Sequence, residues 1–171
     1  MSISVFDHPF LSGLLGDEEV SGYFSAQADI RAMLAFEAAL AKAEARHGIV
    51  PQEIAEQIAS VCASFQPDMA SLRSSAATDG VVIPDLVRQL RKAVGDEAGR
   101  HVHFGATSQD VVDTSLMIRL KAVVFLLAGR LFSLTTAFGQ LDRQFGRNRL
   151  MGHTRMQAAI PITVSDRLRS W

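Results

Sequence analysis

The residues from Ser108 to Phe145 form a long stretch in which only two glycines, Gly129 and Gly139, oppose an α-helix. At ~1.5 Å per residue, such a helix would be roughly 57 Å long. A compact domain the size of this 171-residue chain has a diameter of about 40 Å. The part from Val123 to Leu127 is apolar all round, so it must be buried on every side. We therefore expect a helix bundle completed by other subunits or by further sequence.

The preceding residues predict a set of shorter helices. Ser25 can cap a helix that reaches His47, and Gly48 ends it. Further helices are predicted from about Pro51 to Phe65 and from about Pro84 to Val94, and residues 1–24 are expected to form an irregular arm packed on this body. The apolar stripe of the first long helix consists of Ile30, Met33, Leu34, Ala38 and Ala41. The predicted fold is all-α, with an N-terminal helical domain over residues 1–107 and the start of a central long-helix bundle over residues 108–171.

The composition excludes several classes of protein. The 17 basic and 18 acidic residues give a net charge of −1, which argues against a nucleic-acid partner. A single cysteine, Cys62, excludes an internal disulfide and a cysteine-built zinc site, and we expect it to be a small buried apolar residue. The apolar run from Ala122 to Gly129 is too short to cross a bilayer, and the N-terminus does not resemble a secretory signal. These features favour a cytoplasmic protein without a membrane partner.

Two short segments carry polar side chains suited to binding an anion. The first runs from His101 to Thr114 and includes His103, Thr107, Ser108 and Gln109. Its hydroxyls, together with the free backbone N–H groups at a helix start, would form a site that fits a carboxylate. A purely structural role is the alternative, with Ser108 as a helix cap and Asp113 as a first-turn acid.

The second segment runs from Gly152 to Pro161 and is expected to lie between two helices, the latter opened by Pro161. It places an imidazole, a hydroxyl, a guanidinium and an amide within five residues. These belong to His153, Thr154, Arg155 and Gln157. Polar clusters at helix junctions are common, so solvated loop groups without a function are the alternative.

Taken together, the two segments resemble the signatures of the fumarase/aspartase superfamily. The first is similar to His-x-Gly-x-Thr-Ser followed by Asp and by Asp-Thr, and the second to Gly-Arg-Thr-His-x-Gln-x-Ala-x-Pro. The segment from Phe36 to Ala45, followed by Gly48 to Pro51, resembles the N-terminal helix of the same superfamily. Within it, the segment from Gly105 to Asp110, the opening Phe6-Asp7 and Ile83-Pro84 resemble the carboxymuconate cycloisomerases. The resemblance covers nearly all of the chain.

This resemblance implies a homotetramer built around a bundle of long helices, with active sites shared between subunits. The implied substrate is a tricarboxylate diene from protocatechuate breakdown in the β-ketoadipate pathway. One of its carboxylates adds to a double bond and closes a lactone, without a metal or an organic cofactor. We expect His103, Thr107, Ser108, Gln109, Thr154 and Gln157 to bind the substrate and His153 and Arg155 to be catalytic, with Arg155 holding a carboxylate and His153 the candidate for proton transfer.

One departure from the superfamily pattern bears on the mechanism. Many relatives have Arg-Thr-His where this chain has His153-Thr154-Arg155. An arginine stays protonated, so it is a poor acid or base and a good partner for carboxylates. This favours a cycloisomerase over the alternative, a lyase acting on adenylosuccinate or argininosuccinate.

A further alternative is a catalytically incomplete helical module for oligomerisation. The superfamily's third signature, a Gly-Ser-Ser-x-Met-Pro loop with a serine base, does not occur in the chain. We therefore expect residues 1–171 to be part of a longer enzyme and to be inactive alone.

Overall fold

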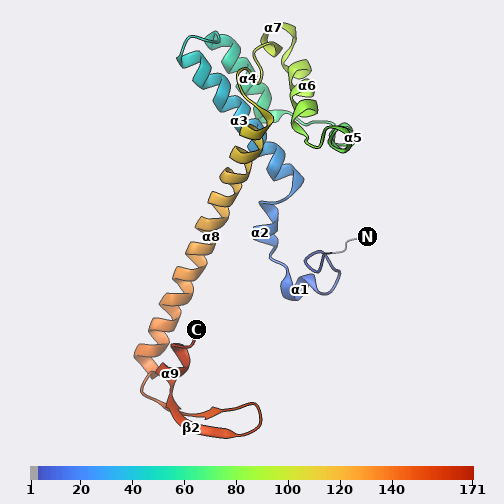
Figure 1. The fold of residues 1–171 in the computed structure, drawn as a ribbon. Helices are drawn as coiled ribbons and strands as arrows, with labels where there is room; N and C mark the ends of the chain where they lie inside the picture. The colour runs from blue at the N-terminus through green and yellow to red at the C-terminus, as the bar shows by residue number, and fades with distance from the viewer. Residues whose placement is uncertain (1–3) are drawn as a thin grey trace. The chain divides into compact units, whose positions relative to one another are not determined.

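The computed structural model describes residues 4–171, which form helices joined by short loops and one small β-hairpin (Figure 1). The predicted all-α class is confirmed. The chain divides into two compact units, Met1–Val123 and Val124–Trp171. Helix α8, Ser108–Phe145, is unbroken as predicted and contains the boundary between the units. The domain boundary expected at residue 107 stays a prediction.

In its described part, the first unit has helices as its regular secondary structure and no strand. It contains α1 (Ser12–Leu15), α2 (Glu18–Gly22), α3 (Ala26–Arg46), α4 (Gln52–Ser64), α5 (Met69–Asp79), α6 (Ile83–Val94), α7 (Asp96–Gly99) and the beginning of α8. The side chain of Ser25 accepts a hydrogen bond from the N–H of Ala28, so it caps α3 as predicted.

The core of this unit lies between α3, α4 and α6. Helices α3 and α4 pack side by side (Figure 1). The predicted stripe of α3 belongs to or packs against the hydrophobic core. Ile58 of α4 and Leu90 of α6 are fully buried. Cys62 is buried as expected, and burial is the main cause that raises the pKa of its thiol to about 11. The thiol is therefore a neutral packing group at pH 7.

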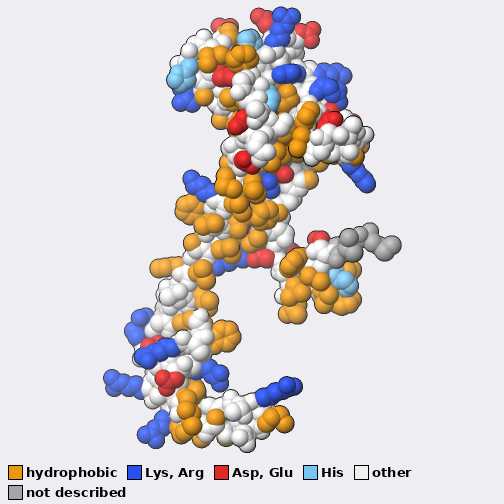
Figure 2. All heavy atoms as spheres, in the orientation of Figure 1, with side chains coloured by type: hydrophobic (Ala, Val, Ile, Leu, Met, Phe, Trp, Pro, Cys, Tyr) orange, Lys and Arg blue, Asp and Glu red, His pale blue; other side chains and the backbone are white. Residues whose placement is uncertain are grey.

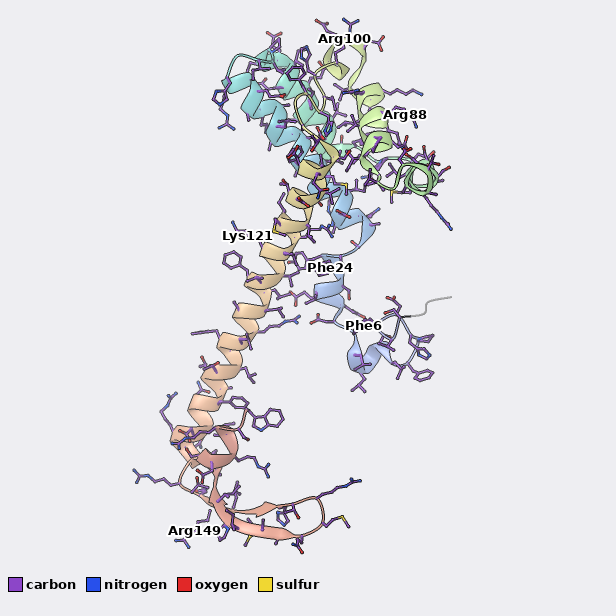
Figure 3. The ribbon with its side chains drawn as sticks, in the orientation of Figure 1. Phe6, Phe24, Arg88, Arg100, Lys121 and Arg149 are labelled. Carbon is purple, nitrogen blue, oxygen red and sulfur yellow. The ribbon has the colours of Figure 1, made fainter. Side chains whose placement is uncertain are left out.

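The start of α8 is fixed to the start of α3 by a partly buried polar cluster. The hydroxyl of Ser115, which is fully buried, donates to Oδ1 of Asp29 at 2.6 Å. The guanidinium of Arg119 pairs with the same oxygen at 2.7 Å and lies over the ring of Phe24, which projects towards α8 (Figure 3). A charge that is paired and hydrogen-bonded in this way fixes the geometry of the helix contact.

The N-terminal arm differs from its prediction. It is not irregular throughout, because α1 and α2 are short helices, and Asp17 caps α2 by accepting from the N–H of Val20. Most of its aromatic and aliphatic side chains are also exposed and not packed on the body. Phe6, Phe10 and Leu14 are 61%, 75% and 81% exposed. The prediction assumed that these apolar side chains are buried, although the sequence did not identify a surface against which they could pack.

The second unit contains a β-hairpin that the sequence analysis did not predict. Strand β1 (Arg149–His153) pairs antiparallel with β2 (Ala158–Thr163), and Arg149 lies at the start of β1 (Figure 3). The prediction that Pro161 opens a helix is wrong, because Pro161 lies opposite Met151 in the hairpin. A two-stranded hairpin has only edge strands, where a missing N–H is tolerated. The last helix, α9 (Val164–Leu168), instead begins at a capping box made by Thr163 and Asp166.

Apolar side chains of α8 lie uncovered in the second unit (Figure 2). Val124, Phe125, Leu131 and Phe132 are 63%, 69%, 62% and 75% exposed. Exposed apolar surface of this kind marks an interaction site. Among the described residues, no helix is both long enough and apolar enough to cross a membrane.

The core of the first unit gives a direct stability prediction. Leu90 is fully buried between α6 and its neighbours, so Leu90→Ala removes apolar contacts and leaves a cavity. We expect the free energy of unfolding to fall by about 2–5 kcal/mol, measured by urea denaturation. Lys42→Ala, an exposed change on α3, is the matched control and should alter it by less than about 0.5 kcal/mol. Equal effects of the two substitutions would contradict this core.

Candidate functional site

The first candidate segment is a tight turn between α7 and α8. His103 has φ 60° and Gly105 has φ 68°, so two residues of this turn adopt the left-handed region. That region is uncommon for a residue other than glycine, and at His103 the surroundings must maintain it. Val102, which precedes His103, anchors the turn. It is buried, and its carbonyl accepts hydrogen bonds from the guanidinium of Arg91 at 3.0 and 3.3 Å. The backbone at His103 is therefore well fixed.

The imidazole of His103 has a carboxylate partner from another helix. Its Nδ1 lies 2.7 Å from Oε1 of Glu37, in the middle of α3. Glu37 is 2% exposed and the side chain of His103 is 14% exposed. The contact joins two residues far apart in the sequence and orients the ring.

The N-terminus of α8 is capped by a side chain of its own first turn. The carboxylate of Asp110 accepts from the backbone N–H of Thr107 at 2.7 Å and from its hydroxyl at 2.8 Å. These two hydrogen bonds, more than the nearby charge of His103, hold the pKa of Asp110 below its usual range, against a smaller opposing effect of burial. Asp110 is therefore ionised at neutral pH. The Thr107 hydroxyl, already donating here, keeps only acceptor capacity for another ligand.

Two further predicted residues occupy the first turn of α8. Ser108 is its first residue, and the N–H groups of Ser108 and Gln109 belong to the turn that lacks intrahelical acceptors. The amide of Gln109 donates to Oδ1 of Asp113 at 2.6 Å, which leaves its second N–H available. The donors best placed for a carboxylate are therefore these N–H groups, the Ser108 hydroxyl and the His103 ring.

The second candidate segment forms the turn of the hairpin. The hydroxyl of Thr154 donates to the carbonyl of Gln157 at 3.1 Å and accepts from its N–H at 3.2 Å. The N–H of Thr154 also donates to that carbonyl, at 2.9 Å. Thr154 thus closes the turn with its side chain, and Arg155 and Met156 project at its tip.

The two predicted catalytic residues are exposed in this hairpin. Nδ1 of His153 lies 3.0 Å from the carbonyl of Met151, a contact within its own strand. Within residues 4–171, the guanidinium of Arg155 has no hydrogen bond or ion pair. A free guanidinium at a turn is available to a carboxylate.

The predicted site residues thus fall into two groups. His103, Thr107, Ser108 and Gln109 come together in the first unit, around the start of α8. His153, Thr154, Arg155 and Gln157 come together in the second unit, around the hairpin turn. Their roles stay predictions.

The sequence analysis missed Glu37 as a partner of His103. An acidic residue in a helix is normally solvated, and the predicted stripe from Ile30 to Ala41 included apolar residues only. The spacing held the missing signal, because Ile30, Glu37 and Glu44 are seven residues apart and share one helix face. Both glutamates are in fact buried.

Comparisons with known proteins place this chain. Residues 16–171 match a protein family described as lyase. Over 148 residues the chain is 36% identical to 3-carboxy-cis,cis-muconate cycloisomerase of Pseudomonas putida, covering 85% of this chain and 35% of that protein. It is 31% identical over its whole length to N-acetyl-S-(2-succino)cysteine lyase of Enterococcus italicus, of which it covers 37%.

A solved structure agrees with these matches. The 3-carboxy-cis,cis-muconate lactonizing enzyme from Pseudomonas putida superposes with a TM-score of 0.86 at 33% identity, over 95% of this chain and 38% of that one. The chain belongs to the lyase family, and its predicted resemblance to the carboxymuconate cycloisomerases of the fumarase/aspartase superfamily is confirmed. It spans a little more than a third of the length of these relatives.

Proposed function

We propose that the complete protein is a cycloisomerase that lactonises 3-carboxy-cis,cis-muconate in the β-ketoadipate pathway of aromatic-acid breakdown. The observation that carries this proposal is the segment from Gly105 to Asp110 at the start of α8, in a chain most of which matches a relative of that name. In the proposed reaction, one carboxylate oxygen adds to a carbon of the diene and closes the ring. The electron pair of the double bond moves to the neighbouring carbon, which takes up one proton.

The start of α8 would bind carboxylates that do not react. The N–H groups of Ser108 and Gln109 point out of a helix N-terminus, where the helix dipole favours an anion. The hydroxyl of Ser108 and the ring of His103 add donors beside them. Thr107 contributes by its backbone position, since its hydroxyl is engaged by Asp110.

The hairpin turn would supply the positive charge. The guanidinium of Arg155 matches a carboxylate with two parallel hydrogen bonds and would stabilise the enolate-like charge that develops during ring closure. Gln157 and Thr154 would shape the turn and bind beside it. His153 is the titratable group in this turn and is our candidate for delivering the proton to carbon. The proposed chemistry needs no metal and no organic cofactor.

The proposed assembly is a homotetramer in which segments of different subunits share each active site. The uncovered side chains Val124, Phe125, Leu131 and Phe132 support it, because they need an apolar partner surface. Packing them against other copies of α8 would bury them as the long-helix bundle of the superfamily requires.

A fumarate-releasing lyase is the second candidate. It is favoured by the 31% identity to N-acetyl-S-(2-succino)cysteine lyase over the whole chain. Arg155 argues against a lyase. Many relatives in the superfamily pattern have a histidine at this position, and a guanidinium cannot exchange a proton near neutral pH.

The choice between the two candidates can be tested with the complete protein. We expect conversion of 3-carboxy-cis,cis-muconate and no cleavage of adenylosuccinate, because Arg155 binds carboxylates and cannot act as an acid. The two reactions can be followed side by side by ultraviolet absorbance. Rapid fumarate release from adenylosuccinate, with the muconate unchanged, would show that the protein is a lyase.

The proposed role of Arg155 predicts a graded loss of activity. Arg155→Lys keeps the charge and loses the planar fork, whereas Arg155→Met loses both. For a contact desolvated between subunits, losing the charge costs on the order of 2–5 kcal/mol, or roughly a thirty- to several thousand-fold fall in kcat/KM. Lysine should lie between Met and wild type, and the pH profile should keep its shape.

Arg149→Met is the matched control for this series. Arg149 is an exposed arginine on the same hairpin, at the end opposite the turn, where it pairs with Thr163. Its substitution should leave kcat/KM near the wild-type value. A normal kcat/KM in Arg155→Met would reject the carboxylate contact.

A further inference from the structure

Glu37 is an ionisable side chain that has no explained role in a helical core. It is 2% exposed, and its Oε2 has no hydrogen-bond partner among the described residues. Burying a carboxylate costs free energy unless its oxygens are paired. Its contact in the core is Nδ1 of His103, 2.7 Å from Oε1. The Glu37 carboxylate is therefore buried at a cost in free energy and contacts a residue of the candidate site, which calls for an explanation.

The charge of Glu37 affects neighbouring ionisable side chains on α3 and α4. Glu44, two turns along α3, is also buried, and burial together with the charge of Glu37 raises the pKa of Glu44, with a smaller opposing effect of His101. On α4, the same charge adds to burial in raising the pKa of Cys62. On the outer side, Asp110 faces His103 from α8. His103 is therefore a basic ring between the carboxylates of α3 and α8.

The ring of His103 also has a fixed backbone beneath it. Its φ of 60° requires outside support, and the adjacent Val102 is buried and held through its carbonyl by Arg91. The hydrogen bond to Glu37 then fixes the remaining freedom of the side chain. Because that bond occupies Nδ1, Nε2 is the ring atom left for another partner.

We infer that Glu37 is a positioning residue, whose buried carboxylate accepts the Nδ1–H hydrogen bond of His103 and presents Nε2 to a substrate carboxylate. The inference rests on the proposed function, which places His103 among the substrate-binding residues. When a substrate carboxylate binds, Nε2 takes up a proton from the solvent and donates a charge-assisted hydrogen bond, while the Glu37 carboxylate neutralises the resulting imidazolium. The hydrogen bond to Glu37 thereby holds the His103 ring in the same orientation whether the ring is neutral or cationic.

The state of the His103 ring can be read directly by nitrogen NMR. In the complete protein labelled with ring-15N histidine, the His103 resonance is assigned by its absence in His103→Gln. We expect Nδ1 to keep its proton through an alkaline titration in the wild type. In Glu37→Met, which removes the acceptor at similar volume, the proton should move mostly to Nε2. An unprotonated Nδ1 in the wild type, or an unchanged ring in the variant, would overturn the inference.

Kinetics separate positioning from a merely structural contact. We expect Glu37→Met to lower kcat/KM by on the order of ten- to a hundred-fold, as when other carboxylates that orient a functional histidine are lost. Because Glu37 acts through the ring, the double variant with His103→Gln should lose no more than His103→Gln alone. Losses that multiply would show that Glu37 acts elsewhere and would overturn the inference.

Two further variants complete the experiment. Glu37→Gln keeps the shape and loses the charge, so it should lower kcat/KM in the same direction even if Glu37→Met folds poorly. Glu44→Gln, at a position that is also buried on the same helix face, should leave kcat/KM near the wild-type value. If the protein fails to convert 3-carboxy-cis,cis-muconate, the proposed function fails, and the ring spectra alone then support or overturn the positioning by Glu37.

Discussion

The contact between the start of α8 and the start of α3 is the interaction on which the candidate site depends. One oxygen of Asp29 accepts from both Ser115 and Arg119, and Ser115 is fully buried there. This cluster sets α8 against α3, and the turn that precedes α8 thereby lies over Glu37. Together with the buried Val102 and the contact between His103 and Glu37, it fixes the donors of the first turn of α8 relative to the core of the unit.

The helices were predictable because local chemistry determines them. Ser25 caps α3, and α8 runs from Ser108 to Phe145 as the absence of breakers indicated. The hairpin was not predictable in the same way. Its strands lack a clear apolar–polar alternation, contain Pro161 and remain largely exposed, so no periodicity marks them. Its ends are instead set by the Thr154 turn and the Thr163 capping box.

The candidate site was predictable in its residue types and only partly in its contacts. The sequence pattern indicated that Thr107 and Gln109 belong to a polar helix start. Their hydrogen bonds to Asp110 and Asp113, however, depend on side-chain geometry. The pairing of His103 with Glu37 was hidden further, because it joins segments 66 residues apart. Long-range contacts of this kind follow from how helices pack, which a single sequence does not display.

The central proposal is that the two polar segments serve one active site in an assembly of subunits. A crystal structure of the complete protein with the lactone product bound tests it most directly. We expect the first turn of α8 from one subunit and the hairpin turn of another to contact carboxylates of the same ligand, with Arg155 pairing one of them and Nε2 of His103 donating to another. A ligand bound within a single subunit, or one that touches neither segment, would contradict the proposal.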